Sequence, residues 1–168
     1  DRDQLEHLSK ALGTLGAPVD LPRLFGFVMD WMVAGPFDNT GRKGFDIAFA
    51  PETAAELSST MPGKDGPVRW QRFRTEHEFG MVDINQVYGA LKEVTAYARA
   101  EFRSDAERDA ELRLGCKNAW KVWANGRLLF SRDEYHRGMA MDQYRLPVRL
   151  RPGANVILVK LCQSEQTQ

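Results

Sequence analysis

The sequence lacks the long hydrophobic runs and the surplus of one charge that define several classes of protein. Its longest purely apolar stretches are only a few residues, whereas a helix that spans a bilayer needs about 20. Lysine plus arginine and aspartate plus glutamate number 23 each, so the formal net charge is zero. Proteins that bind nucleic acids or anionic membranes usually carry a basic surplus on one face, so we expect neither partner. The 168 residues suffice for one domain with a buried core.

Cysteine is also scarce. Cys116 and Cys162 permit one disulfide at most, and both have apolar neighbours, which favours two buried thiols over a disulfide. The first residues, DRDQLEHLSK, lack the apolar core of a signal peptide. A segment taken from a longer chain would lack one too, so this feature does not define the compartment.

Motifs for hydrolysis, zinc binding and phosphate binding are missing. No serine lies in a GxSxG nucleophile elbow, the three histidines do not form HExxH, and the cysteines do not form CxxC. The glycines of GTLGAP and GRKG do not sit between a buried strand and a helix start, as a P-loop requires. Paired carboxylates for glycoside hydrolysis remain open, because the two can lie far apart in the chain. We therefore expect a module without catalytic activity, with a hydrolase as the less favoured alternative.

Residues 1–24 are predicted to form a short helix and a connector. Four leucines recur at helical spacing, and they are Leu5, Leu8, Leu12 and Leu15. Gly16 and Pro18 end this pattern.

From Val28 onward the pattern is typical of strands separated by turn residues. VMDWMVAG (28–35) has the length of a strand and is expected to end at Gly35-Pro36. LKEVTAYARAEFRS (91–104) has the composition of a helix, but its apolar and polar residues alternate strictly from Val94 to Arg103. Because periodicity outweighs propensity over this length, a half-buried strand is predicted there.

The last strands define the expected fold class. YRLPVRLR and NVILVKLCQ are predicted as a pair joined by the turn RPGA, and the run VILVKL indicates a central strand covered on both faces. Seven or eight strands, with turns about every ten residues, predict an all-β fold. We expect an antiparallel β-sandwich of jelly-roll type over residues 25–163, followed by a polar tail, 164–168.

WKVWANGRLLF (120–130) contains the clearest local signal in the chain. Asn125-Gly126 between two apolar-rich runs favours a type I′ hairpin turn, because both central residues need positive φ. In the later turn, Gly153 is expected to serve the turn itself and Asn155 to cap the last strand.

The two tryptophans of this hairpin differ by three positions, so a strand places them on opposite faces. Val122 and Ala124 share the face of Trp120. This alternation predicts that Trp120 points into the core and Trp123 points outward.

GPFDNTGRKGFDIAFAPE (35–52) surrounds two phenylalanines with turn-forming residues. In the structural interpretation, Asp38 and Asn39 make Asx-type turn bonds. Phe37 and Phe45 then anchor the corner in the core, because a loop of turn-forming residues has little intrinsic order.

A calcium site is the alternative for the same stretch. Asp38, Asn39 and Asp46 offer the hard oxygen ligands that calcium prefers. Their spacing does not match an EF-hand loop, and Arg42 and Lys43 place positive charge among them. The structural interpretation is therefore favoured, and we expect no cofactor.

Four segments resemble accessory domains of large multidomain proteins from environmental bacteria. They are W-x-V-x-GPFDN-x-G-x-x-GFD (31–46), AWKVWANGRLLF, DEYHRGMAMDQY and LRPGANVILVKLCQ. Those domains are galactose-binding-like β-sandwiches, similar to modules attached to glycoside hydrolases and sialate esterases, and the resemblance covers residues 25–163. Two features depart from the family. Related hairpins commonly carry acidic residues where this chain has 116–118, CKN, and a closing strand usually follows the VILVKL element, which SEQTQ does not resemble.

The resemblance implies a non-catalytic module of a larger, exported bacterial protein, periplasmic or secreted. Such a module would bind carbohydrate or position a neighbouring catalytic domain, and a purely architectural spacer without ligand is the alternative. Neighbouring domains of the same chain, and carbohydrate, are thus the expected partners. Because flat aromatic faces stack on sugar rings, Trp123 is a candidate carbohydrate-binding residue, together with Tyr135 and His136.

Replacing Gly126 with valine tests the predicted hairpin turn. Gly126→Val forces a β-branched residue to positive φ and is expected to cost about 1–2 kcal/mol of unfolding free energy. Chemical denaturation measures this loss, and an unchanged midpoint would show that the turn is misassigned.

Overall fold

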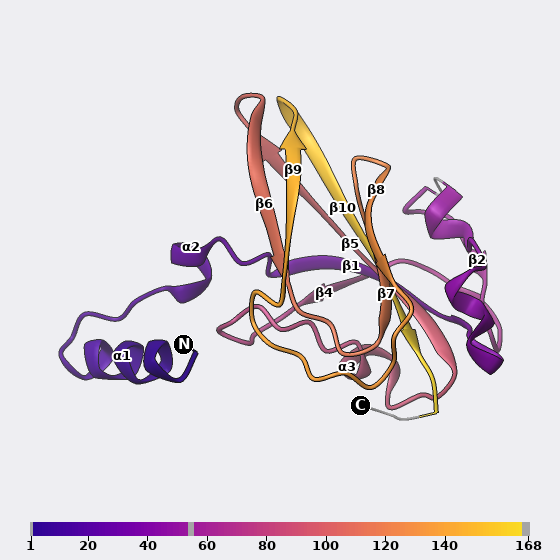
Figure 1. Ribbon diagram of the computed structural model, residues 1–168, viewed down its shortest axis with the longest axis horizontal. Helices are drawn as coiled ribbons and strands as arrows, with labels where there is room; N and C mark the ends of the chain where they lie inside the picture. Colours follow the sequence, from indigo (N-terminus) through magenta and orange to yellow (C-terminus); the bar gives the residue numbers. More distant parts are fainter. Residues whose placement is uncertain (1, 54–55, 166–168) are drawn as a thin grey trace.

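A six-stranded antiparallel sheet forms the centre of the structure, a computed structural model that describes residues 2–53 and 56–165 (Figure 1). Its strands, in spatial order, are β4 (Gln71–Arg74), β1 (Asp30–Asp38), β5 (Val94–Ser104), β10 (Gly153–Gln163), β7 (Ala119–Ala124) and β8 (Arg127–Arg132). A second sheet pairs β6 (Arg108–Leu114) with β9 (Tyr144–Leu150), and a third pairs β2 (Met61–Pro62) with β3 (Pro67–Val68). The predicted antiparallel β-sandwich is therefore confirmed.

The helical segments are short. They are α1 (Arg2–Thr14), α2 (Leu21–Phe25), η1 (Thr40–Phe45), η2 (Ala50–Thr53) and α3 (Asn85–Tyr88). The predicted N-terminal helix is confirmed as α1, which lies to one side of the sandwich (Figure 1). The predicted apolar stripe remains largely uncovered, since Leu8 in α1 and Leu15 just after it are 57% and 80% exposed. Among the described helices, none has the length and apolar character needed to cross a membrane.

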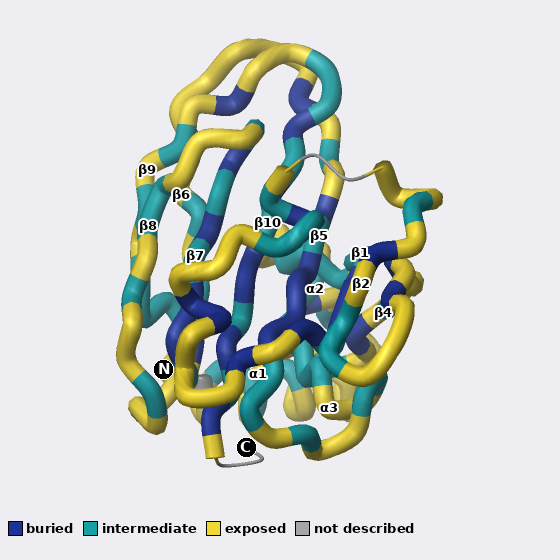
Figure 2. Tube along the Cα trace, turned by 90° about the vertical axis from the view of Figure 1, so that its right-hand side faces the viewer, coloured by how far each residue is buried: buried dark blue, intermediate teal, exposed yellow. Residues whose placement is uncertain are grey.

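The two faces of the large sheet are covered differently. The sandwich face packs against β6 and β9, whose Leu112 and Tyr144 contact the core around the fully buried Trp120. The opposite face, here the cover face, packs against residues 39–53 and 61–70, here the cover segment. Buried positions accordingly concentrate along the central strands β5, β10 and β7 (Figure 2).

The predicted strand at β5 is confirmed, but it is covered on both faces rather than half-buried. Ala96 and Ala98 are buried on the sandwich face, as the alternation predicts. Thr95 and Tyr97 on the other side are also fully buried, because the cover segment lies over them. The prediction that β1 ends at Gly35-Pro36 is wrong as well, because the strand continues to Asp38 after a register shift.

The predicted pairing of the last two strands is wrong. β9 pairs with β6 in the small sheet, whereas β10 lies between β5 and β7 as the predicted central strand. The turn between β9 and β10 therefore carries the chain from one sheet to the other. Asn155 holds this turn, since its side chain accepts a hydrogen bond from Arg151 N (3.0 Å) and donates to Arg151 O (2.8 Å).

Two asparagines join this turn to the β7–β8 hairpin. Asn125 and Gly126 both have positive φ (51° and 81°), as a type I′ turn requires. Asn125 Nδ2 donates to Asn155 Oδ1 at 2.9 Å, and Val156 N donates to Asn125 Oδ1 at 2.9 Å. Asn155 is nearly fully buried, so these bonds satisfy polar groups that would otherwise be unpaired in the interior.

Both cysteines are buried and unpaired in the structure. Burial raises the pKa of the Cys116 thiol to about 11, and burial likewise raises the pKa of the Cys162 thiol to about 11. Both thiols are therefore protonated at neutral pH.

A buried lysine attaches the cover segment to β10. Lys160 Nζ donates to the carbonyl oxygens of Phe45 (3.1 Å) and Ile47 (2.7 Å) and to Glu52 Oε1 (2.8 Å). Its side chain has no exposed surface, and that of Glu52 is 13% exposed. The Tyr97 hydroxyl also donates to Glu52, and burial together with this carboxylate raises the pKa of Tyr97 well above its usual range.

Lys160→Met is expected to destabilise the protein by about 3–5 kcal/mol, because it leaves the Glu52 carboxylate buried without its cation. Chemical denaturation measures this loss. Lys10→Met is the control and should leave the unfolding free energy nearly unchanged, since Lys10 pairs with Glu6 on the exposed surface of α1 at 2.9 Å. Equal unfolding free energies for the two variants would refute a stabilising role for the buried pair.

Candidate functional site

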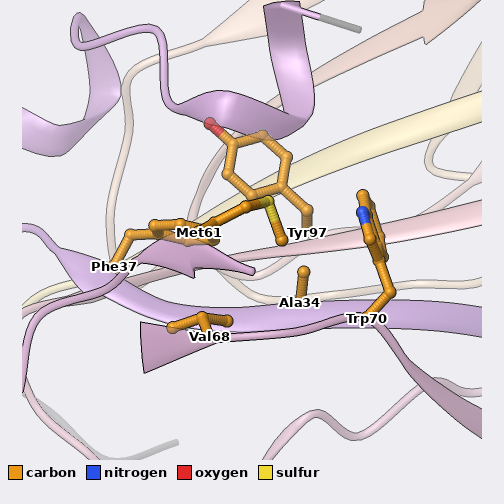
Figure 3. Packing of buried hydrophobic residues seen from close by; sticks show 6 residues of the cluster. All are labelled: Ala34, Phe37, Met61, Val68, Trp70 and Tyr97. Carbon is orange, nitrogen blue, oxygen red and sulfur yellow. The ribbon is translucent and has the colours of Figure 1, made fainter. Parts of the chain in front are cut away.

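The corner at residues 35–46 is anchored by aromatic rings. Phe37 is 1% exposed, and its ring lies 5.0 Å from that of Phe49 and 5.5 Å from that of Tyr97. Figure 3 shows Phe37 and Trp70 on either side of Tyr97 above the sheet. Phe45 is buried as well, beneath the ammonium group of Lys121 at 4.3 Å. Both phenylalanines that the sequence nominates as anchors thus lie in the core.

The polar residues of this corner bond to neighbouring protein groups. Asp38 Oδ1 accepts from Thr40 Oγ1 at 2.7 Å, and Lys64 Nζ lies 3.4 Å away. The Thr40 hydroxyl, with a smaller contribution from Lys64, lowers the pKa of the Asp38 carboxyl. Asn39 is fully buried, and its Nδ2 donates to the carbonyl oxygen of Gln163 at 2.7 Å. Asp38 and Asn39 therefore hold the corner in its conformation.

The proposed calcium ligands Asp38, Asn39 and Asp46 have different surroundings. Within residues 2–53 and 56–165, no group of three or more His, Cys, Asp or Glu side chains is placed to hold a metal ion. Asp46 is exposed at the end of η1. A Cβ added at Gly44 would lie 2.8 Å from Asn39 Oδ1 and 2.5 Å from Asp38 O, so the backbone of Gly44 packs directly against these oxygens. Gly44 thus occupies the space beside the Asn39 oxygen.

Tyr135 and His136 lie at the same corner. The Tyr135 ring packs near Phe45, its hydroxyl accepts from Asn39 Nδ2 at 3.2 Å, and burial raises its pKa. His136 Nε2 lies 3.1 Å from the hydroxyl of Ser164, the first residue of the predicted polar tail, whose residues 166–168 lie outside the described residues. These contacts fasten the loop after β8 to the end of β10.

Trp123 lies elsewhere, in a row of side chains that crosses the cover face with one residue from each strand of the large sheet. Directly paired residues of antiparallel strands point to the same face, so the register defines the row. From β4 to β8 it consists of Arg72, Met32, Arg99, Leu158, Trp123 and Leu128. We refer to these six residues as the Trp123 row.

The Trp123 row marks the edge of the cover segment. All six of its residues are half-buried or exposed, and Leu128 reaches 48% exposure. Two positions further along β1, β5 and β10, Ala34, Tyr97 and Lys160 are fully buried. The row is therefore the first part of the cover face that solvent reaches.

The charged residues of the row, Arg72 and Arg99, lie on the β4 side of its apolar run Leu158, Trp123 and Leu128. Arg99 Nη2 lies 2.9 Å from Glu101 Oε2, and these side chains are 22% and 51% exposed. Within the described part of the chain, Arg72 makes no ion pair. The row thus combines the indole ring of Trp123 and aliphatic side chains with Arg99, a hydrogen-bond donor held in place by the acceptor Glu101.

The three predicted carbohydrate-binding residues do not form one site. Trp123 pairs with Leu158, whereas Tyr135 packs beside Cys162, which lies four residues further along β10. At about 3.3 Å per residue this separation is about 13 Å. Alternation alone assigns Trp123 to the outer face. Its cross-strand neighbours Leu158 and Leu128 follow from the pairing of strands, for which the sequence carries no local signal.

Comparison of the chain with protein-family models, with curated proteins and with solved structures found no match. The resemblance to galactose-binding-like accessory domains therefore stays a prediction.

Removal of metal ions tests the corner directly. EDTA is expected to leave the Tm unchanged, because Asp38 Oδ1 already accepts from Thr40 and the Gly44 backbone packs against Asn39 Oδ1, and Asp38→Ala should cost about 1 kcal/mol. Thermal denaturation of the wild type with and without EDTA, then with added calcium, measures the effect of metal removal. Denaturation of Asp38→Ala beside the wild type measures the cost of the substitution. A fall of several degrees that calcium reverses would instead assign Asp38, Asn39 and Asp46 to an ion.

Proposed function

We propose that the chain is a non-catalytic β-sandwich module that binds carbohydrate through the Trp123 row. The observation that carries this proposal is a half-buried indole at the edge of the cover segment, in the same row as Arg99, which pairs with Glu101 at 2.9 Å. The apolar face of a pyranose ring packs against a flat aromatic ring. Leu158 and Leu128, the cross-strand partners of Trp123, extend this apolar surface on both sides.

Arg99 and Glu101 supply hydrogen bonds for sugar hydroxyls in this proposal. A guanidinium group only donates and a carboxylate only accepts, so together they match hydroxyl groups, which do both. Because the two side chains already hold each other, little of their side-chain entropy is lost when a ligand binds.

The sequence resemblance supports the same class of function. Accessory sandwiches attached to glycoside hydrolases and sialate esterases are modules of larger bacterial proteins, and this chain would serve a larger exported protein in the same way. Fold-level analogy does not identify a ligand, so the proposal depends on the Trp123 row.

A second role, positioning a neighbouring domain, is favoured by the N-terminal segment. Leu8 of α1 and Leu15, just after its end, are 57% and 80% exposed, and Leu24 and Phe25 of α2 are 66% and 47% exposed. Apolar faces of helices are normally buried against another element or a partner. A neighbouring domain that packs on α1 and α2 would be held at a fixed place beside the sandwich (Figure 1).

A glycan array followed by titration calorimetry tests carbohydrate binding. Trp123→Ala is expected to weaken binding of the selected glycan by at least about tenfold, which corresponds to about 1.4 kcal/mol. His136→Ala is the control and should bind as the wild type does, because His136 contacts Ser164 at the distant corner. Unchanged affinity in Trp123→Ala, or the absence of any bound glycan, would reject the proposal.

A further inference from the structure

A cleft of about 550 Å³ opens between the β7–β8 hairpin and the outer sheet of β6 and β9. Most of its lining residues belong to the sandwich side of the large sheet, and it shares Leu128 with the Trp123 row. Pockets that bind small molecules usually measure about 300–1,000 Å³. The cleft therefore has the size of a small-molecule site.

The walls of the cleft are mainly aliphatic, although Asp109 and Asn125 also line it. Ala124 and Leu129 come from the hairpin, and Ala110, Leu146 and Val148 come from the outer sheet. Among the described residues that line it, none is aromatic. Sugar rings stack on aromatic faces, so these walls suit a saturated hydrocarbon chain better than a sugar.

Two arginines line the cleft, and they differ in their partners. Arg149 is neutralised by two carboxylates, with Nη2 2.6 Å from Glu107 Oε1 and Nη1 2.9 Å from Asp109 Oδ1. Arg127, next to the hairpin turn, makes no ion pair and no side-chain hydrogen bond within residues 2–53 and 56–165. Its guanidinium group is thus available for an anion, and a carboxylate is the planar, bidentate partner that it fits.

We propose that this cleft binds an unbranched aliphatic carboxylate. The hydrocarbon chain lies between the hairpin and the outer sheet, against Leu129, Leu146 and Val148, and the carboxylate pairs with Arg127. Burial of the chain supplies most of the affinity, and the ion pair selects the acid over an uncharged chain of the same length. The site differs from the Trp123 row in its ligand and in most of its residues, although Leu128 belongs to both.

Titration with octanoate and with 1-octanol, followed by NMR of leucine and valine methyl groups, tests this site. Octanoate is expected to give saturable shifts at Leu129, Leu146 and Val148. Arg127→Gln should weaken octanoate binding by about tenfold and change that of 1-octanol by less than about twofold. Arg145→Gln is the matched control and should change neither, since Arg145 is an exposed arginine of β9 outside the cleft.

Several results would overturn the proposal. They are the absence of saturable shifts at the three cleft residues, equal octanoate affinity in Arg127→Gln and wild type, and equal weakening by Arg127→Gln and Arg145→Gln. Val148→Phe, which fills the cleft with a larger apolar side chain, should abolish binding of both ligands. Retained octanoate binding in a folded Val148→Phe protein would place the ligand elsewhere.

Discussion

The buried ammonium group of Lys160 is the contact on which the arrangement of the cover face depends. An ammonium group without solvent needs an acceptor for each of its protons, and Lys160 finds all three in the cover segment, at Phe45, Ile47 and Glu52. Those bonds hold the cover segment over Tyr97, so β5 and β10 become strands with two buried faces. The segment that Lys160 binds does not extend over the Trp123 row, so the sheet becomes accessible to solvent there.

Coverage of the large sheet is incomplete on both sides, and the two candidate sites lie where it stops. On the cover face, the last covered row contains Tyr97 and Lys160, and the next row exposes Trp123. On the sandwich face, the outer layer has only two strands, and the cleft opens where β9 faces the β7–β8 hairpin. The two sites differ in their side chains. The first has an indole in one row with charged groups, and the second has aliphatic walls and an arginine that makes no ion pair among the described residues.

Local patterns in the sequence predicted single strands and turns well, because alternation and turn chemistry act within a few residues. The alternation from Val94 to Arg103 predicted β5, and Asn125-Gly126 predicted the hairpin. The burial of Lys160, by contrast, depends on a segment more than 100 residues away, and nothing near it in the sequence indicates three acceptors. The sequence predicts the candidate site only in part. Alternation assigns Trp123 to the outer face, but its cross-strand neighbours follow from strand register. The position of Tyr135 depends on its hydrogen bond to Asn39, which is far away in the sequence.

The state of the two cysteines has a consequence for where such a protein can work. Cys116 and Cys162 are the only sulfhydryl groups in the sequence, both are covered by the core, and both stay in the unreactive thiol form at neutral pH. Thiol–disulfide exchange requires an accessible thiolate, so these two thiols should react only slowly with glutathione disulfide or protein oxidants. The folded chain therefore needs neither a reducing nor an oxidising environment to keep its covalent structure.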